Sequence, residues 1–170
     1  MTASGQLIIR DAEPQEREVV VELTRLAYAE FQSVMTPTAW RGLSNAVDDV
    51  LANSGPAEII VATDGHRIIG SVFLYPGGSS PYPDGKPLQE PEVRLLSIEP
   101  AQRGRGVGRA LVNECIRRAK EANASEIGLH TSASFRAAIA LYRSMGFERV
   151  PERDFTPPGA EVVEGYRLVL

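Results

Sequence analysis

The sequence is short of cysteine, with Cys115 alone among its 170 residues, so no disulfide bond can form within the chain. It also contains no uninterrupted apolar run near the ~20 residues that a membrane-spanning helix needs. The first residues, MTASGQLIIRD, do not place a basic segment before an apolar one, as a secretory signal does. From these absences we expect a cytoplasmic protein that has no membrane as a partner.

Histidine is scarce as well, and positive charge is not in excess. Only His66 and His130 are present, and because we find no carboxylates paired with them, we expect no metal site. The net charge of −4 argues against general nucleic-acid binding. No aromatic residues interleave with the arginines, as they do in single-strand binders, so we expect no nucleic acid as a partner.

Positive charge is nonetheless concentrated in one segment. Residues 103–120 hold six basic residues and one acidic residue, Glu114, which gives this segment +5 and leaves −9 for the rest of the chain. An anionic ligand that docks on the segment would explain this concentration, and so would a solvated helix face. The pattern alone leaves both open. The basic residues are Arg103, Arg105, Arg109, Arg117, Arg118 and Lys120.

The periodicity of apolar residues predicts one α/β domain over residues 1–170. Strand-like and helix-like runs follow one another in the order β-α-α-β-β-β-α-β-α-β-β, with a hairpin at the DGH turn. This order indicates one mixed sheet with helices packed on it. Residues 76–91 form a long loop, of a length that is usually functional or disordered. The expected strands are 6–10, 57–63, 67–75, 92–100, 125–131, 147–153 and 165–170, and the expected helices are about 14–31, 35–53, 107–123 and 134–145.

The stretch QRGRGVGRAL, residues 102–111, lies between an expected strand and an expected helix. A helix start offers backbone amides without partners and the positive end of the helix dipole. Glycines before it let the backbone approach a ligand closely, so the stretch suits a phosphate group. Its spelling excludes the dinucleotide fingerprint, because Arg109 stands at the last glycine position, and the Walker loop, which needs a lysine. A flexible basic turn is the alternative.

Two motifs together resemble the GNAT superfamily of acyl-coenzyme A-dependent N-acyltransferases. The first, LLSIEPAQRGRGVGRAL, contains the family signature [QR]-x-x-G-x-[GA] as Arg103-x-x-Gly106-x-Gly108, after a proline-containing turn. The second, AIALYRSMGF at residues 138–147, repeats the family pattern of alanine, leucine-tyrosine and glycine-phenylalanine. Together with the order of elements, the resemblance extends from about residue 6 to the end of the chain.

The resemblance implies a GNAT fold, in which a mostly antiparallel sheet contains one splayed parallel strand pair and is flanked by helices. It implies transfer of an acetyl group from acetyl-CoA to a primary amine, without a metal, by direct attack in a ternary complex. A GNAT-fold sensor that binds acyl-CoA without turnover is the alternative. The amine acceptor could be a small molecule or a peptide. Dimers are common in the family, so a homodimer is one candidate assembly, but the sequence alone does not decide the oligomeric state.

The family's matching positions suggest a role for each site residue. Tyr142 matches the tyrosine that protonates the leaving thiolate, although its apolar helix face also fits a core residue. Glu92 matches a glutamate that serves several members as general base, and an ordinary strand-edge carboxylate is the alternative. Main-chain groups of Leu96, Ser97 and Ile98 would pair with the pantetheine arm. Backbone amides would hold the pyrophosphate along Arg103, Gly104, Arg105, Gly106, Val107, Gly108 and Arg109.

One position departs from the family pattern. Many members carry an asparagine that contacts the pantetheine arm, and here that place is Phe135, with Ser134 beside it. The polar contact is lost, while the Phe135 ring offers a packing surface for the coenzyme. Cys115 lies on the apolar face of its helix, so we expect a core residue rather than a nucleophile. Candidates for recognising the amine are Glu152, Asp154, Glu161, Tyr28, Phe31 and Trp40.

Overall fold

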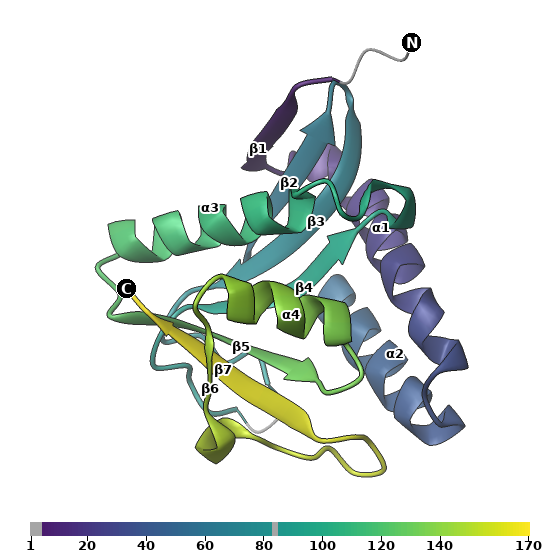
Figure 1. Cartoon of the computed structure of the whole chain (residues 1–170), viewed down its shortest axis with the longest axis vertical. Coiled ribbons are helices and arrows are strands. Elements are labelled where there is room, and N and C mark those ends of the chain that lie inside the picture. Colours follow the sequence, from purple (N-terminus) through teal and green to yellow (C-terminus); the bar gives the residue numbers. More distant parts are fainter. Residues whose placement is uncertain (1–4, 83–84) are drawn as a thin grey trace.

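One seven-stranded sheet organises the computed structural model, which describes residues 5–82 and 85–170 (Figure 1). The strand order is β1-β2-β3-β4-β5-β7-β6. The strands are β1 (Leu7–Asp11), β2 (Glu58–Asp64), β3 (Arg67–Tyr75), β4 (Glu92–Ile98), β5 (Glu126–Ser132), β6 (Glu148–Arg149) and β7 (Val163–Val169). The α-helices are α1 (Arg17–Ala29), α2 (Pro37–Ala52), α3 (Val107–Glu121) and α4 (Arg136–Ser144).

All neighbouring strands of this sheet pair antiparallel except β4 and β5, which are parallel. The β2–β3 hairpin turns at Gly65, whose φ of 71° suits a residue without a side chain. The expected mixed sheet, mostly antiparallel with one parallel pair and flanked by helices, is therefore confirmed.

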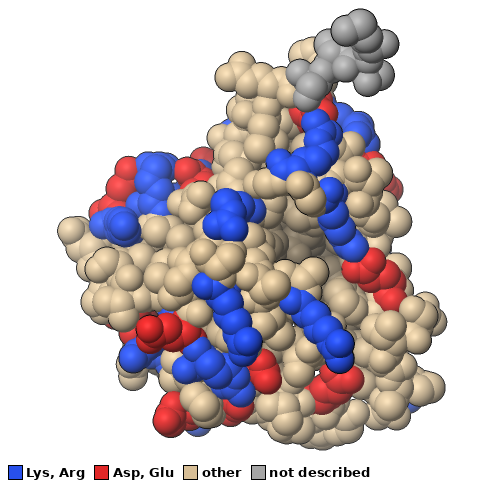
Figure 2. Space-filling model, in the orientation of Figure 1, with Lys and Arg blue, Asp and Glu red and all other residues tan. Residues whose placement is uncertain are grey.

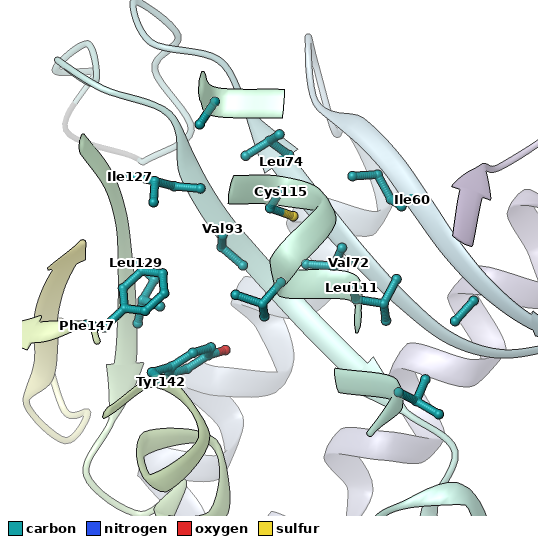
Figure 3. Close-up of a cluster of buried hydrophobic side chains, with 14 of the residues drawn as sticks. Ile60, Val72, Leu74, Val93, Leu111, Cys115, Ile127, Leu129, Tyr142 and Phe147 are labelled. Atoms are coloured by element: carbon teal, nitrogen blue, oxygen red, sulfur yellow. The ribbon is translucent and has the colours of Figure 1, made fainter. Parts of the chain in front are cut away.

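The alternation of side chains along the strands divides the core between the two faces of the sheet. On β3, Val72 and Leu74 belong to the core under α3 and α4, whereas Phe73 and Tyr75 belong to the core under α1 and α2. Figure 3 shows the first of these cores, in which Cys115 is fully buried. Burial raises the pKa of the Cys115 thiol to about 12, as expected of a core residue.

Two expected elements differ in extent. The helix expected over residues 14–31 is divided, because 3-10 turns at Pro14–Glu16 and Glu30–Ser33 flank α1. The strand expected over 147–153 is only the two-residue β6, because a 3-10 turn begins at Pro151, which has no N–H for a strand ladder. The described part of loop 76–91 contains no helix or strand, as expected.

None of the helices within the described ranges combines the length and the apolar character that crossing a bilayer requires.

Candidate active site

A gap opens in the sheet between the two parallel strands. β4 and β5 are in register only at Glu92 with Gly128 and at Val93 with Leu129, although each strand has seven residues. From Arg94 onwards the edge of β4 that faces β5 is unpaired in the described sheet. The splay predicted from the family resemblance is therefore present, and it exposes main-chain donors and acceptors along this edge.

A β-bulge in β4 accompanies this divergence. The register between β3 and β4 shifts by one residue between Ser71 and Phe73, and Leu95 has a φ of 49°. This left-handed conformation costs a non-glycine residue roughly 1–2 kcal/mol. The extra residue brings both Arg94 and Leu95 to the edge of a cavity.

The cavity, of about 660 Å³, lies at this gap and is bounded by groups from both faces of the sheet. Tyr28 and Phe31 contribute from the α1 side, and Leu141 and Tyr142 from α4. Figure 2 shows this face of the molecule hollowed near its middle, with basic and acidic side chains around the hollow. The cavity therefore lies at the gap between β4 and β5 and has walls on both faces of the sheet.

The glycine loop forms one end of the cavity. Gly104 and Gly106 have φ values of 77° and 81°, and Gly106 is the N-cap of α3. The amides of Val107, Gly108 and Arg109, in the first turn, have no intrahelical acceptor. A β-carbon on Gly108 would lie 3.2 Å from a Leu141 methyl group, so a small residue here lets α3 approach α4 closely.

The arginine side chains of this loop bind protein groups. Arg103 donates to both carboxylate oxygens of Glu30, at 2.7 and 2.6 Å, and to the Ala27 carbonyl at 3.2 Å. Arg109 donates to the Ser144 hydroxyl at 2.7 Å, and Arg105 donates to Gln102. The feature of the loop best suited to an anion is therefore its main chain, which agrees with the emphasis on backbone amides in the sequence prediction.

Further along α3 the concentration of basic residues is balanced by nearby acids. Arg117 pairs with Glu114 and Glu121, and Arg118 pairs with Glu114, Asp11 and Glu58. Of the two explanations for the basic segment, these pairs favour a helix face neutralised by acids over one built for an anionic ligand at Arg117 and Arg118.

Tyr142 is both a core residue and a cavity residue. It is 6% exposed, its ring centroid lies 5.7 Å from that of Phe147, and it lines the cavity. Figure 3 shows its hydroxyl pointing away from Phe147. Burial raises the pKa of Tyr142 well above its usual value, so the hydroxyl keeps its proton at neutral pH.

Glu92, at the start of β4, lies against Tyr82 and His130. It is 4% exposed and is not among the residues that line the cavity. Its Oε1 accepts a hydrogen bond from the Tyr82 hydroxyl and lies 3.1 Å from Nδ1 of His130. The interpretation of His130 as a histidine without a carboxylate partner was therefore wrong. Glu92 is also buried, unlike an exposed carboxylate at a strand edge, and its role as a base stays a prediction.

The other residues predicted to bind the coenzyme fall into two groups, those that line the cavity and those that do not. Leu96, Ile98, Ser134 and Phe135 line the cavity, whereas Ser97 is buried with its hydroxyl on the Leu95 carbonyl, at 3.1 Å. Arg105 is not part of the lining. The cavity thus gathers most of the residues that the family resemblance indicated, but not Glu92, Ser97 or Arg105.

The candidates for recognising an amine are only partly brought together. Phe31 and Phe135 stack with ring centroids 4.1 Å apart, and Tyr28 contacts Phe135 edge-on at 5.7 Å, all in the cavity wall. Glu161 accepts hydrogen bonds from Ser132 and Ser134, both at 2.7 Å. Asp154 pairs with Arg149, and neither Trp40 nor Glu152 lines the cavity.

Tyr82 and His130, which contact Glu92, were not among the predicted site residues. The sequence carried no signal for His130, because only the register of β4 with β5, which pairs Glu92 with Gly128, brings it close to Glu92. Tyr82 lies in the long loop, where no periodicity predicts the direction of a side chain. Among the described residues, no three His, Cys, Asp or Glu side chains gather as metal ligands would.

Comparison with known proteins agrees with this geometry. The model of the acetyltransferase (GNAT) family matches residues 20–147. The chain is 41% identical over 64 residues to the N-alpha-acetyltransferase RimI of Mycobacterium tuberculosis, which covers 38% of this chain and 39% of that relative. The chain spans less than half the length of the curated relatives it matches, for example 17% of one and 42% of another.

Solved structures with the same fold cover nearly the whole chain. A GNAT-family acetyltransferase from Staphylococcus aureus superimposes with a TM-score of 0.70 at 18% identity, over 97% of this chain and 99% of that one. A GNAT-family acetyltransferase from Brucella melitensis in complex with acetyl-CoA has a TM-score of 0.62 at 19% identity, over 97% and 88%. Since the family match covers most of the sequence, this chain belongs to the acetyltransferase (GNAT) family.

Proposed function

We propose that this protein transfers an acetyl group from acetyl-CoA to a primary amine by direct attack within a ternary complex. The observation that carries the proposal is the cavity at the gap between β4 and β5, because residues from both the α4 side and the α1 side of the sheet line it. A donor and an acceptor that enter from opposite sides would meet there without a covalent enzyme intermediate. Cys115, the one cysteine, is fully buried and is not among the residues that line the cavity.

The residues present fit a coenzyme A thioester. The first-turn amides of α3 suit the pyrophosphate, and the unpaired edge of β4 near Leu96 and Ile98 suits the amide groups of pantetheine. The cavity volume of about 660 Å³ lies within the range of small-molecule sites. The coenzyme, when bound, supplies an activated acyl carbonyl and a thiolate leaving group. In the Brucella relative, the bound ligand is acetyl-CoA.

Tyr142 serves in this proposal as the general acid. Its hydroxyl makes no hydrogen bond to another described residue. Among the described residues, the polar side-chain atoms that have no partner and no accessible surface are Ser71 Oγ and Arg167 Nε, so the Tyr142 hydroxyl keeps some accessible surface. It therefore faces the cavity with its proton available. Since burial raises the pKa of Tyr142, the hydroxyl carries its proton at neutral pH and can donate it towards the sulfur as the carbon–sulfur bond breaks.

Glu92 serves as the general base. A primary amine with a pKa near ~10.4 is mostly protonated at neutral pH, so it must lose a proton before it attacks. Glu92 lies at the point where the strands begin to diverge, but outside the cavity lining, so the proton travels through a water molecule. The RimI relative is named for acetylation of α-amino groups, which supports an amine as the acceptor class.

The test is release of free thiol from acetyl-CoA in the presence of a panel of primary amines that includes peptides with free N-termini. The protein's own thiol gives little background, because Cys115 is buried and its pKa is raised to about 12. Amine-dependent thiol release is the expected result. Tight acetyl-CoA binding without thiol release across the panel would instead support an acyl-CoA sensor.

A further inference from the structure

The buried cluster of Tyr82, Glu92 and His130 has a fixed pattern of protons. His130 Nε2 lies 2.9 Å from the Arg153 carbonyl oxygen, and because a carbonyl only accepts, Nε2 carries a proton. Nδ1 lies 3.1 Å from Oε1 of Glu92. An ionised carboxylate also only accepts, so favourable contact requires a proton on Nδ1 as well. The arrangement therefore fits an imidazolium beside a carboxylate.

Tyr82 completes the cluster from the long loop. Its hydroxyl donates to Oε1 of Glu92 and lies 3.0 Å from His130 Nδ1. Burial, followed by the charge of Glu92, raises the pKa of Tyr82 well above its usual value, so it remains a donor. The Arg94 guanidinium lies 4.5 Å from the centre of the Tyr82 ring and donates to the Pro81 carbonyl at 3.0 Å, which holds this part of the loop in place.

The two oxygens of Glu92 are not equivalent. Both contacts described above end on Oε1, and Oε2 accepts no hydrogen bond from the described residues. In the described part of the chain, only Ser71 Oγ and Arg167 Nε have neither a hydrogen-bond partner nor accessible surface. Oε2 has no partner and is not one of these two atoms, so it keeps some surface that water can reach. Glu92 consequently presents one occupied oxygen and one oxygen that water can reach.

We infer that Tyr82 and His130 are positioning residues, which fix Oε1 of Glu92 and direct Oε2 to accept the proton of the substrate amine through water. The inference rests on the proposed function for its catalytic meaning. In the proton transfer, one N–H bond of the ammonium breaks, its electron pair stays on nitrogen, and one O–H bond forms at Oε2. The total charge does not change.

The surroundings of His130 determine how this cluster responds to pH. Glu92 and Arg94 face it from β4, Tyr82 from the loop, and the Arg153 carbonyl and the Phe155 ring from the segment after β6, with Asp154 nearby. Burial lowers the pKa of His130, and Arg94 lowers it further. The hydrogen bond and charge of Glu92, together with the hydrogen bond to the Arg153 carbonyl, raise it by more, so the pKa is higher than in a free histidine.

The pairing is tested without turnover by nitrogen-detected NMR titration of the two histidines in the coenzyme-free full-length protein. We expect both ring nitrogens of His130 to be protonated at neutral pH, and we expect its pKa to fall in Glu92→Gln. His66, which lies in the β2–β3 turn, is the internal control and should not respond. A neutral His130 in the wild type, or an identical titration in Glu92→Gln, would overturn the inference.

Positioning is then tested by kinetics with the most active amine of the panel. Tyr82→Phe removes only a hydroxyl and should lower kcat about tenfold, with little change in KM for acetyl-CoA. His130→Gln should move the acidic limb of the pH–rate profile to higher pH, because the buried carboxylate loses its cation. His66→Gln is the matched control.

The two tests separate the two proposals. If thiol release is absent with every amine, the proposed function fails, whereas the NMR titration still decides whether the pair exists. If turnover is present and both Tyr82→Phe and His130→Gln keep the wild-type kcat and pH limb, the positioning role is refuted while the transferase proposal stands.

Discussion

Replacement of Gly106 by alanine tests the glycine loop by its backbone conformation alone. Gly106 has a φ of 81°, and a β-carbon added there would meet no atom within 4 Å. The cost is therefore conformational, about 1–2 kcal/mol for a left-handed residue with a side chain. In a chain of this size, that cost corresponds to a decrease in Tm of roughly 2–4 °C per kcal/mol.

The same strain should weaken coenzyme binding if the loop amides hold the pyrophosphate. Relaxation of Gly106 to a negative φ would turn the N-cap peptide and move the amides of Val107 and Gly108. A hydrogen bond to a charged group contributes about 1.5–3 kcal/mol, so the loss of one lowers affinity about 10- to 150-fold. Isothermal titration calorimetry with acetyl-CoA measures this change.

Gly65→Ala is the matched control. Gly65 has a φ of 71°, has no atom within 4 Å of an added β-carbon, and lies in the β2–β3 turn outside the cavity lining. It should show the same loss of stability with an unchanged Kd for acetyl-CoA. Equal acetyl-CoA affinity in Gly106→Ala and the wild type would refute the assignment of the loop.

Three further predictions follow from individual side chains. Tyr142→Phe should lower kcat about 10- to 100-fold while the Kd for acetyl-CoA stays the same within about twofold, and an unchanged kcat would remove Tyr142 from the mechanism. The hydrogen bond from Arg117 lowers the pKa of Glu114 from 4.5 to about 2. Since this pKa is lower in the folded protein, Glu114 stabilises the fold above about pH 4.5, and its contribution is lost as the pH falls towards 2. Urea unfolding should therefore show a stability difference between wild type and Glu114→Gln that is largest near neutral pH and shrinks towards pH 2, whereas a constant difference would contradict the pairing. Cys115, buried with a pKa raised to about 12, should react with a maleimide only after denaturation, and fast labelling of the native protein would show that the core is open.

Features that depend on local sequence could be predicted well. The helices and most strands follow from apolar periodicity, and the glycine loop follows from residues 102–111, which are consecutive in the chain. The pairing of Arg117 with Glu114 was not predicted, although it is also local, because the two residues are one helical turn apart. The divergence of β4 from β5 was predicted from the family resemblance alone, since no residue type in β4 indicates it. Leu95 adopts a φ of 49° without a glycine to mark the bulge.

Features that depend on strand register could not be predicted from a single sequence. His130 and Glu92 are 38 positions apart, and only the pairing of β4 with β5 brings them together. Arg103 and Glu30, 73 positions apart, meet because α1 ends beside the glycine loop. The sequence places Arg103 in a predicted anion-binding loop, whereas its side chain binds Glu30 and the Ala27 carbonyl at the end of α1. We therefore propose the backbone amides, and not this side chain, as the anion-binding groups of the loop.

The central claim is that acetyl-CoA occupies the gap between β4 and β5, with its pyrophosphate at the start of α3. Hydrogen–deuterium exchange with and without acetyl-CoA tests it directly, because the amides concerned belong to two short segments, 94–98 and 104–109. We predict slower exchange in both segments when acetyl-CoA is bound, with no change in the β2–β3 turn. Unchanged exchange in both segments at saturating acetyl-CoA, or protection confined to another part of the chain, would contradict the account.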